Sequence, residues 1–184
     1  GCLLDLNDFA GALECATQAE SVARELKDNA MLARALTNKG NAVASQGDYK
    51  AALMCFDEAE KLTRPTGSKR TLLQVLSSYG LALAKALDFA RAVQVLNEAV
   101  DLLEGLGQGR TPLHFTLLGA LAASQSSVGQ NIESERNAAL AMSILEALKK
   151  INAQMSDRDL EWLPFVQRGG NSQYMAQTMN FTPR

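Results

Sequence analysis

The sequence predicts an all-α protein, an α-solenoid of antiparallel helix pairs, from its composition, an internal repeat and the turn residues between helices. Leu and Ala together make up almost a third of the chain, several times the share of Ile and Val. Helices favour Ala, Leu and unbranched side chains, and strands favour β-branched and aromatic ones. The composition therefore argues against an all-β or doubly wound α/β fold and favours helices that pack closely through small side chains.

An internal repeat runs through most of the chain. Residues 7–12 (NDFAGA) recur as residues 47–52 (GDYKAA) and again as residues 87–92 (LDFARA), so the period from 7 to 47 to 87 is constant. A weaker fourth copy begins at Gly129, slightly out of register, and keeps small residues at 134, 138 and 141. Repeats of this length are typical of stacked supersecondary units, each of which buries its apolar face against its neighbours.

Each unit is expected to contain two helices. Apolar and small residues recur at helical spacing, Asp48 stands where an N-cap is expected, and the RPTGS segment at 64–68 should end a helix. Thr111 and Pro112 are typical of a helix start. The expected helices cover residues 30–46, 48–62, 70–86, 88–104, 111–128 and 130–152.

The motifs resemble the tetratricopeptide repeat (TPR), in a variant with a longer period than the family's commonest one. The resemblance covers roughly residues 5–150 and depends on a glycine in the first helix of each pair, an Asp-aromatic corner and a small-large-small pattern in the second helix. The matching residues are Gly40, Gly47, Asp48, Tyr49, Ala52, Phe56 and Ala59, and then Gly80, Asp88, Phe89, Ala92, Leu96 and Ala99. The resemblance implies a TPR-like superhelix in which small residues let paired helices approach closely.

The expected organisation has three parts. Residues 1–152 form about three and a half repeats, the first of them truncated because Asp8 is so near the start. Residues 153–167 form a capping helix, stopped by Pro164, in which Trp162 covers the end of the last repeat; the alternative is a patch that docks a partner. Residues 168–184 form a flexible tail, which alternatively docks into a groove through Tyr174, Met175, Met179 and Phe181.

The TPR resemblance implies that the first helix of each pair lines a concave groove that holds a partner peptide or helix. Asn41 is the foremost candidate, because an amide can both donate to and accept from a bound backbone. The candidate partner-binding residues are Arg34, Thr37, Asn38, Asn41, Ser45, Gln74, Ser77, Ser78, Leu81 and Lys85, and the third pair offers Thr116, Gly119, Ala123 and Ser127. Too few cations lie at the family's carboxylate-clamp positions to favour a receptor for chaperone tails.

Several other functions are not indicated. The formal net charge of −2 gives no general electrostatic case for nucleic acid, and no apolar run is long enough for a membrane span. His114 is expected on the surface, and the glycine-rich segment at 105–110 follows a helix rather than a strand, so neither predicts a metal, a cofactor or a nucleotide site. The three cysteines fit reduced thiols and a cytoplasmic location. We expect no enzyme activity and no cofactor.

Three function classes remain open at this stage. The first is a protein-interaction adaptor or scaffold that binds a partner segment in the groove. The second is a structural subunit that self-associates through the truncated first repeat or the tail. The third is the regulatory domain of a larger enzyme or transcription factor. The repeat architecture favours the first class.

Overall fold

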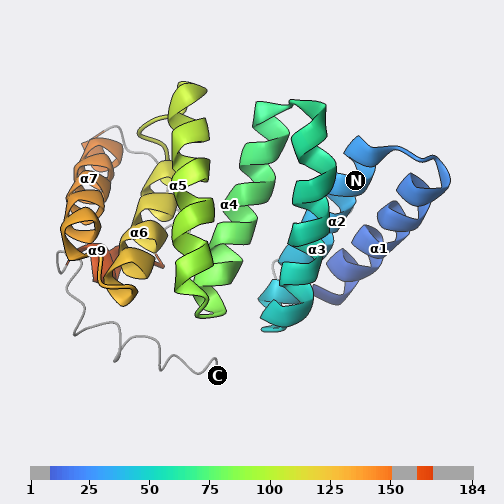
Figure 1. Ribbon diagram of the computed structural model, residues 1–184, viewed down its shortest axis with the longest axis horizontal. Coiled ribbons are helices and arrows are strands. Elements are labelled where there is room, and N and C mark those ends of the chain that lie inside the picture. The colour runs from blue at the N-terminus through green and yellow to red at the C-terminus, as the bar shows by residue number, and fades with distance from the viewer. Residues whose placement is uncertain (1–8, 151–160, 168–184) are drawn as a thin grey trace. The chain divides into compact units, whose positions relative to one another are not determined.

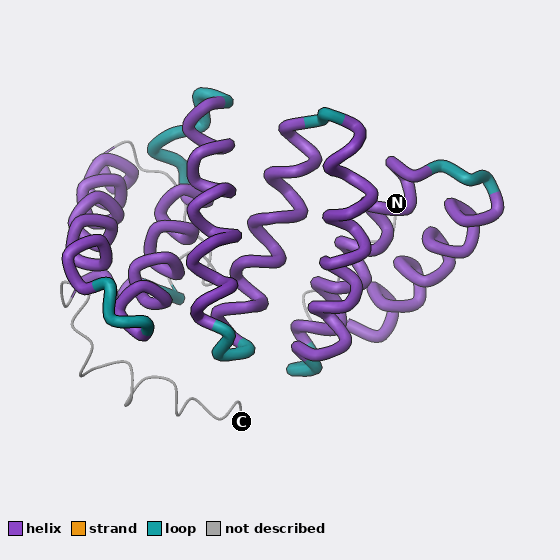
Figure 2. The backbone as a smooth tube through the Cα atoms, in the orientation of Figure 1, coloured by secondary structure: helices purple, strands orange, loops and turns teal. Residues whose placement is uncertain are grey.

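The computed structural model describes residues 9–150 and 161–167, and these contain helices and loops but no strand (Figure 2). The side chains of residues 9, 10 and 165 are not described. The chain divides into two compact units, residues 1–86 and 87–184. The all-α prediction is confirmed for the described ranges. No described helix is long and apolar enough to cross a membrane.

The first unit is a succession of helices in which each one packs on the next (Figure 1). Its helix α2 also contacts α4 directly, so the first helices of two successive pairs are neighbours. The elements are α1 (Phe9–Glu25), α2 (Asn29–Ser45), α3 (Tyr49–Thr63), the 3-10 turn η1 (Arg64–Thr66) and α4 (Lys69–Lys85). The boundaries predicted for α2, α3 and α4 are confirmed to within one position.

Side chains cap these helices, as the sequence predicts for Asp48. Asp28 precedes α2, and its carboxylate accepts hydrogen bonds from the backbone N–H groups of Ala30 and Met31, both at 3.0 Å. Asp48 precedes α3 and accepts from the N–H of Ala51 at 3.0 Å. These bonds satisfy N–H groups that have no partner within the helix, so an aspartate marks the start of α2 and of α3, and Ser68 does the same for α4.

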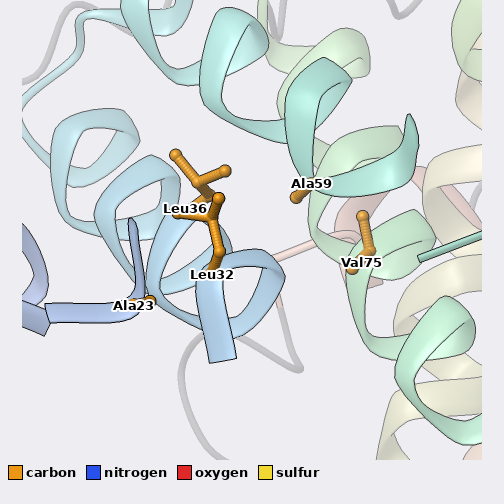
Figure 3. Close-up of a cluster of buried hydrophobic side chains, with 5 residues drawn as sticks. All are labelled: Ala23, Leu32, Leu36, Ala59 and Val75. Atoms are coloured by element: carbon orange, nitrogen blue, oxygen red, sulfur yellow. The ribbon is translucent and has the colours of Figure 1, made fainter. Parts of the chain in front are cut away.

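The core of the first unit draws on all four of its α-helices. Ala23, Leu32, Leu36, Ala59 and Val75 form one buried cluster (Figure 3). Helices α2 and α3 approach closely at Gly40, where an added Cβ would lie 2.8 Å from Phe56 Cε1. The ring of Phe56, which is fully buried, lies 6.0 Å from that of Tyr79 on α4. Gly40 is therefore a site of close packing between α2 and α3.

The repeat is also present in the backbone torsion angles of the turns. A residue with positive φ precedes each helix from α2 to α7, and all but the last of these recur at the period of the sequence repeat. Glycine occupies most of these positions because it adopts positive φ without steric cost. The residues are Lys27, Gly67 and Gly107 in one series, and Gly47, Leu87 and Gly129 in the other, while Arg110 is a further case outside both series.

The second unit centres on helix α6 (Pro112–Ser127), which packs on both α5 (Phe89–Gly105) and α7 (Asn131–Lys150). Thr111 caps α6, and its hydroxyl accepts a hydrogen bond from the N–H of His114 at 3.2 Å. Residues 114–126 of α6 are all buried. The small residues of the weak fourth copy pack here, because Ser134, Ala138 and Ala141 are fully buried and the Ser134 hydroxyl donates to the Ala122 carbonyl at 2.8 Å.

The short helix α9 (Leu163–Gln167) packs on α7 and α6. Trp162 and Val166 are buried there, and an added Cβ at Gly119 would lie 2.6 Å from Trp162 Cβ. Residues 161–167 therefore pack on α6 at Gly119. Pro164 lies in the first turn of α9 rather than after it, where proline is tolerated. The rest of the expected capping helix (153–160) and the expected tail (168–184) lie outside the described residues.

Candidate partner-binding face

Most of the residues predicted to bind a partner lie in two matching stripes. Positions 34, 38, 41 and 45 of α2 follow helical spacing along one side, and positions 74, 78, 81 and 85 of α4 repeat this pattern one period later. Because α2 and α4 contact each other, the stripes belong to neighbouring helices. We define the α2/α4 face as the residues of these stripes that are not buried, together with Arg70: Arg34, Asn38, Asn41, Ser45, Arg70, Gln74, Ser78 and Lys85.

Three of the predicted residues do not belong to this face. Thr37 and Ser77 are buried, and their hydroxyls donate to the carbonyls one turn earlier, of Ala33 and Leu73, at 2.7 Å each. Leu81 is only 8% exposed. In a helix packed on several neighbours, these positions turn toward the packed side, so their side chains are unavailable to a partner in this conformation.

The amide side chains of the α2/α4 face are available for binding. Asn38 and Gln74 are exposed and Asn41 is half-buried. None of the three amides forms a hydrogen bond with another described residue. Ser45 differs, because its hydroxyl donates to the backbone carbonyl of Asn41 at 2.9 Å. The face thus presents groups that can donate to and accept from a peptide backbone.

Arg70 is not among the residues that the sequence predicts for this face. This exposed residue lies one turn before Gln74 and extends the α4 stripe toward its N-terminal end. The helical spacing between Arg70 and Gln74 could have identified it. The equivalent position one repeat earlier is Ala30, so the repeat pattern does not indicate a binding residue at position 70.

Lys39 of α2 is excluded from the face because it is held on another side of the helix. Its Nζ lies 2.8 Å from Glu20 Oε2 of α1, and Glu20 also binds Arg24, which reaches Glu58 of α3. The hydrogen bond from Lys39 lowers the pKa of the Glu20 carboxyl, and the same contact raises the pKa of Lys39. This network joins α1, α2 and α3 and serves to hold the first unit together.

The third helix pair does not offer a comparable face. Thr116, Gly119 and Ala123 are buried in α6, and only Ser127 of the four expected positions is exposed. The Thr116 hydroxyl donates to the carbonyl of Pro112 at 3.0 Å. The close contact between Gly119 and Trp162 shows the reason: residues 161–167 pack on this side of α6.

His114 is buried, which corrects the expectation that it lies on the surface. It is 4% exposed, its Nδ1 accepts from the N–H of Arg110 at 3.2 Å, and its Nε2 lies 3.3 Å from Glu104 Oε1. Burial lowers the pKa of His114, and the neighbouring carboxylate of Glu104 opposes that shift. A neutral imidazole with its proton on Nε2 fits this surrounding, because Nδ1 serves as an acceptor.

The cysteine expectation also needs correction. Cys15 on α1 is disulfide-bonded, so the expectation of three reduced thiols is wrong there. Cys55 on α3 is a free, half-buried thiol, and burial raises its pKa. A raised pKa keeps the thiol protonated and weakly nucleophilic. Disulfides persist mainly in oxidising compartments, so the disulfide at Cys15 does not support the predicted cytoplasmic location. That location stays a prediction.

The described ranges contain no group of three or more His, Cys, Asp or Glu residues that could hold a metal ion. The accessible groups of the α2/α4 face are amides, hydroxyls and cations. Such groups can bind a peptide backbone and negatively charged side chains, whereas none of them is a nucleophile activated by an adjacent general base.

Comparison with known proteins supports the fold alone. No protein-family model matches the chain, and no curated protein sequence matches it. Among solved structures, the chain is similar to BtubC (BKLC) from P. vanneervenii, with a TM-score of 0.63 and 15% sequence identity. The match covers 94% of this chain and 71% of that one. The similarity shows a shared all-helical architecture.

Proposed function

We propose that this chain is a TPR-like α-solenoid and a non-catalytic protein-interaction module that holds a partner segment on the α2/α4 face. The proposal rests chiefly on one observation: two neighbouring helices, one repeat apart in sequence, present matching stripes of accessible polar side chains. Repeat proteins use such surfaces, built from equivalent positions of successive units, to bind extended partners.

The dimensions of the face suit a short peptide. From Arg34 to Ser45 the α2 stripe spans about 17 Å, which corresponds to about five residues of extended chain. Asn38 and Asn41 lie within this span and Gln74 lies on the adjacent helix. Amides at these three positions would hold the partner's backbone, while side chains at the ends of the stripes would select its sequence.

Site-specific photocrosslinking tests the proposal. A photoreactive amino acid would replace Asn38 or Gln74 in separate variants, and Met54, which is 70% exposed on α3, would provide the matched control position. Incubation with native lysate should give the same crosslinked partner from positions 38 and 74, and none from position 54. The double variant Asn41→Ala/Lys85→Glu should remove that crosslink while leaving the circular dichroism spectrum unchanged.

The same experiment distinguishes an adaptor from a subunit that self-associates. Crosslinks from position 54 but not from 38 or 74 would contradict the placement of the binding site. Crosslinks only between copies of this chain would favour a structural subunit that self-associates. A partner captured at the α2/α4 face, however, would support an adaptor or scaffold.

A further inference from the structure

We infer that the segment held by the α2/α4 face is an acidic stretch of a partner protein, in which Asp or Glu side chains contact Arg34 and Arg70. This inference rests on the proposed function and adds the chemical class of the partner. The inference follows from how charge is distributed among the helices of the first unit. The overall net charge of −2 would not by itself indicate an acidic partner.

Charge in the first unit is segregated by helix. Helices α2 and α4 together contain no Asp or Glu and five Lys or Arg residues, of which Lys39 is paired with Glu20 of α1. Helices α1 and α3 together contain six Asp or Glu residues and three Lys or Arg. The helices that form the candidate face are therefore positive, although they belong to an acidic protein. A surface of one sign attracts and orients a segment of the opposite sign.

The two arginines are exposed and are not neutralised by another described residue. Arg34 and Arg70 are exposed, and neither forms an ion pair within the described ranges. The acidic group nearest to Arg34 in sequence, Asp28, caps α2 and accepts two backbone N–H groups. Both guanidinium groups can therefore bind a carboxylate, which a planar fork of N–H donors does in a bidentate manner.

Their positions suit a peptide that lies across both helices. Arg34 and Gln74 occupy equivalent positions of successive repeats. Because Arg70 precedes Gln74 by about one helical turn, it lies about 6 Å further toward the N-terminal end of α4. The amides of Asn38 and Asn41 continue the stripe from Arg34. A partner could thus place carboxylates on the two arginines while its backbone meets the amides.

Selection from a phage-displayed library of random peptides tests the inference. Peptides selected on the wild-type chain should be enriched in Asp and Glu, and their binding should weaken as salt is raised. Arg34→Gln/Arg70→Gln should reduce the affinity of a selected peptide about tenfold, as expected for two partly exposed charge contacts. The reversal Arg34→Glu/Arg70→Glu should abolish binding.

A matched control has the same change in net charge elsewhere. Lys50→Glu/Lys149→Glu alters exposed lysines of α3 and α7 and should leave peptide affinity unchanged within twofold. Thermal unfolding followed by circular dichroism would confirm that all variants fold. A single-stranded oligouridine would be titrated in parallel, because a positive face could instead bind nucleic acid.

The outcomes distinguish the two proposals. Neutral or basic peptides that lose affinity in Asn41→Ala but not in Arg34→Gln/Arg70→Gln would overturn the inference and leave the proposed function intact. Selected peptides that bind equally well to every α2/α4-face variant would overturn both. Oligouridine binding that depends on Arg34 and Arg70, without enrichment of acidic peptides, would overturn the inference in favour of nucleic acid.

Discussion

The same repeat position serves opposite purposes in helices α2 and α6. At Arg34 and Asn41 of α2 the side chains are polar and accessible, whereas their counterparts in α6, Thr116 and Ala123, are buried. The difference lies in what packs on the helix, because Trp162 and Val166 cover α6 at Gly119. A repeat position therefore does not by itself define a binding residue, and the segment that follows the last repeat decides whether its helix is open.

The largest expected effect comes from removing the cover of α6. Trp162→Ala should lower the free energy of unfolding by about 3–5 kcal/mol, because it removes a large buried ring and leaves a cavity. Thermal and urea unfolding followed by circular dichroism would measure this.

Asn38→Ala is the matched change on the open helix α2. It should leave stability unchanged or raise it by up to about 0.7 kcal/mol, since alanine is the better helix former. Equal destabilisation by the two changes would contradict the distinction between a covered and an open helix.

A smaller effect is expected from overfilling the contact between α6 and α9. Gly119→Ala would place a methyl group within 2.6 Å of Trp162 Cβ, and it should cost about 1–3 kcal/mol in the free energy of unfolding. The cost should shrink in a Trp162→Gly background, because glycine lacks the Cβ that the added methyl group meets, whereas alanine keeps it. Additive effects in this double-mutant cycle would show that residues 161–167 do not rest on Gly119.

Stability should respond to pH through a different group in each unit. Burial lowers the folded-state pKa of His114 below 6.5, so the unfolded chain binds the proton more readily. The contribution of His114 to the free energy of unfolding is complete above about pH 6.5 and is lost as the pH falls through the folded-state pKa. His114→Gln should therefore flatten the rise in stability between about pH 5 and pH 7, measured as urea midpoints.

Glu20 acts in a lower pH window. Its folded-state pKa is held below 4.5 mainly by Lys39, so its stabilising effect is present above about pH 4.5 and lost below it. Glu20→Gln should flatten the stability profile only in that acidic range. A change between pH 5 and pH 7 in this variant would contradict the assignment of that window to His114.

A small effect is also expected in the turns. Lys27 has φ of 53°, at the position that glycine occupies in both later copies, Gly67 and Gly107. Lys27→Gly should raise stability by up to about 1 kcal/mol, because it removes the steric cost of positive φ in a residue with a Cβ. Gly67→Ala, at the equivalent turn, should lower it. Differential scanning calorimetry would resolve both shifts, and the same sign for both changes would contradict the account.

Much of the fold could be predicted because the repeat imposes it locally. Asp48 and Thr111 cap helices, and Gly40 allows close packing against Phe56. Ser134 stands where earlier copies of the repeat have alanine, and its hydroxyl donates a hydrogen bond to the Ala122 carbonyl. Each of these features depends on residues near in sequence or on the repeat period. The helix boundaries followed from the same signals.

The burial of individual site residues could not be predicted, because it depends on contacts between distant parts of the chain. Helical spacing alone does not show that Thr37 and Ser77 turn inward, nor that residues 161–167 pack on α6. His114 was expected on the surface because it follows a helix start, yet the side chain lies beside Glu104 of the preceding helix. Tertiary packing decided these positions.

The most direct test of the central claim is a map of amide chemical shifts in the isotope-labelled chain during titration with a peptide selected on it. The account predicts that the largest shifts arise along α2 and α4, near Arg34, Asn38, Asn41 and Gln74, and that α6 responds little because it is covered. Shifts concentrated on α3 or α7, with α2 and α4 unchanged, would contradict the assignment of the α2/α4 face as the binding site.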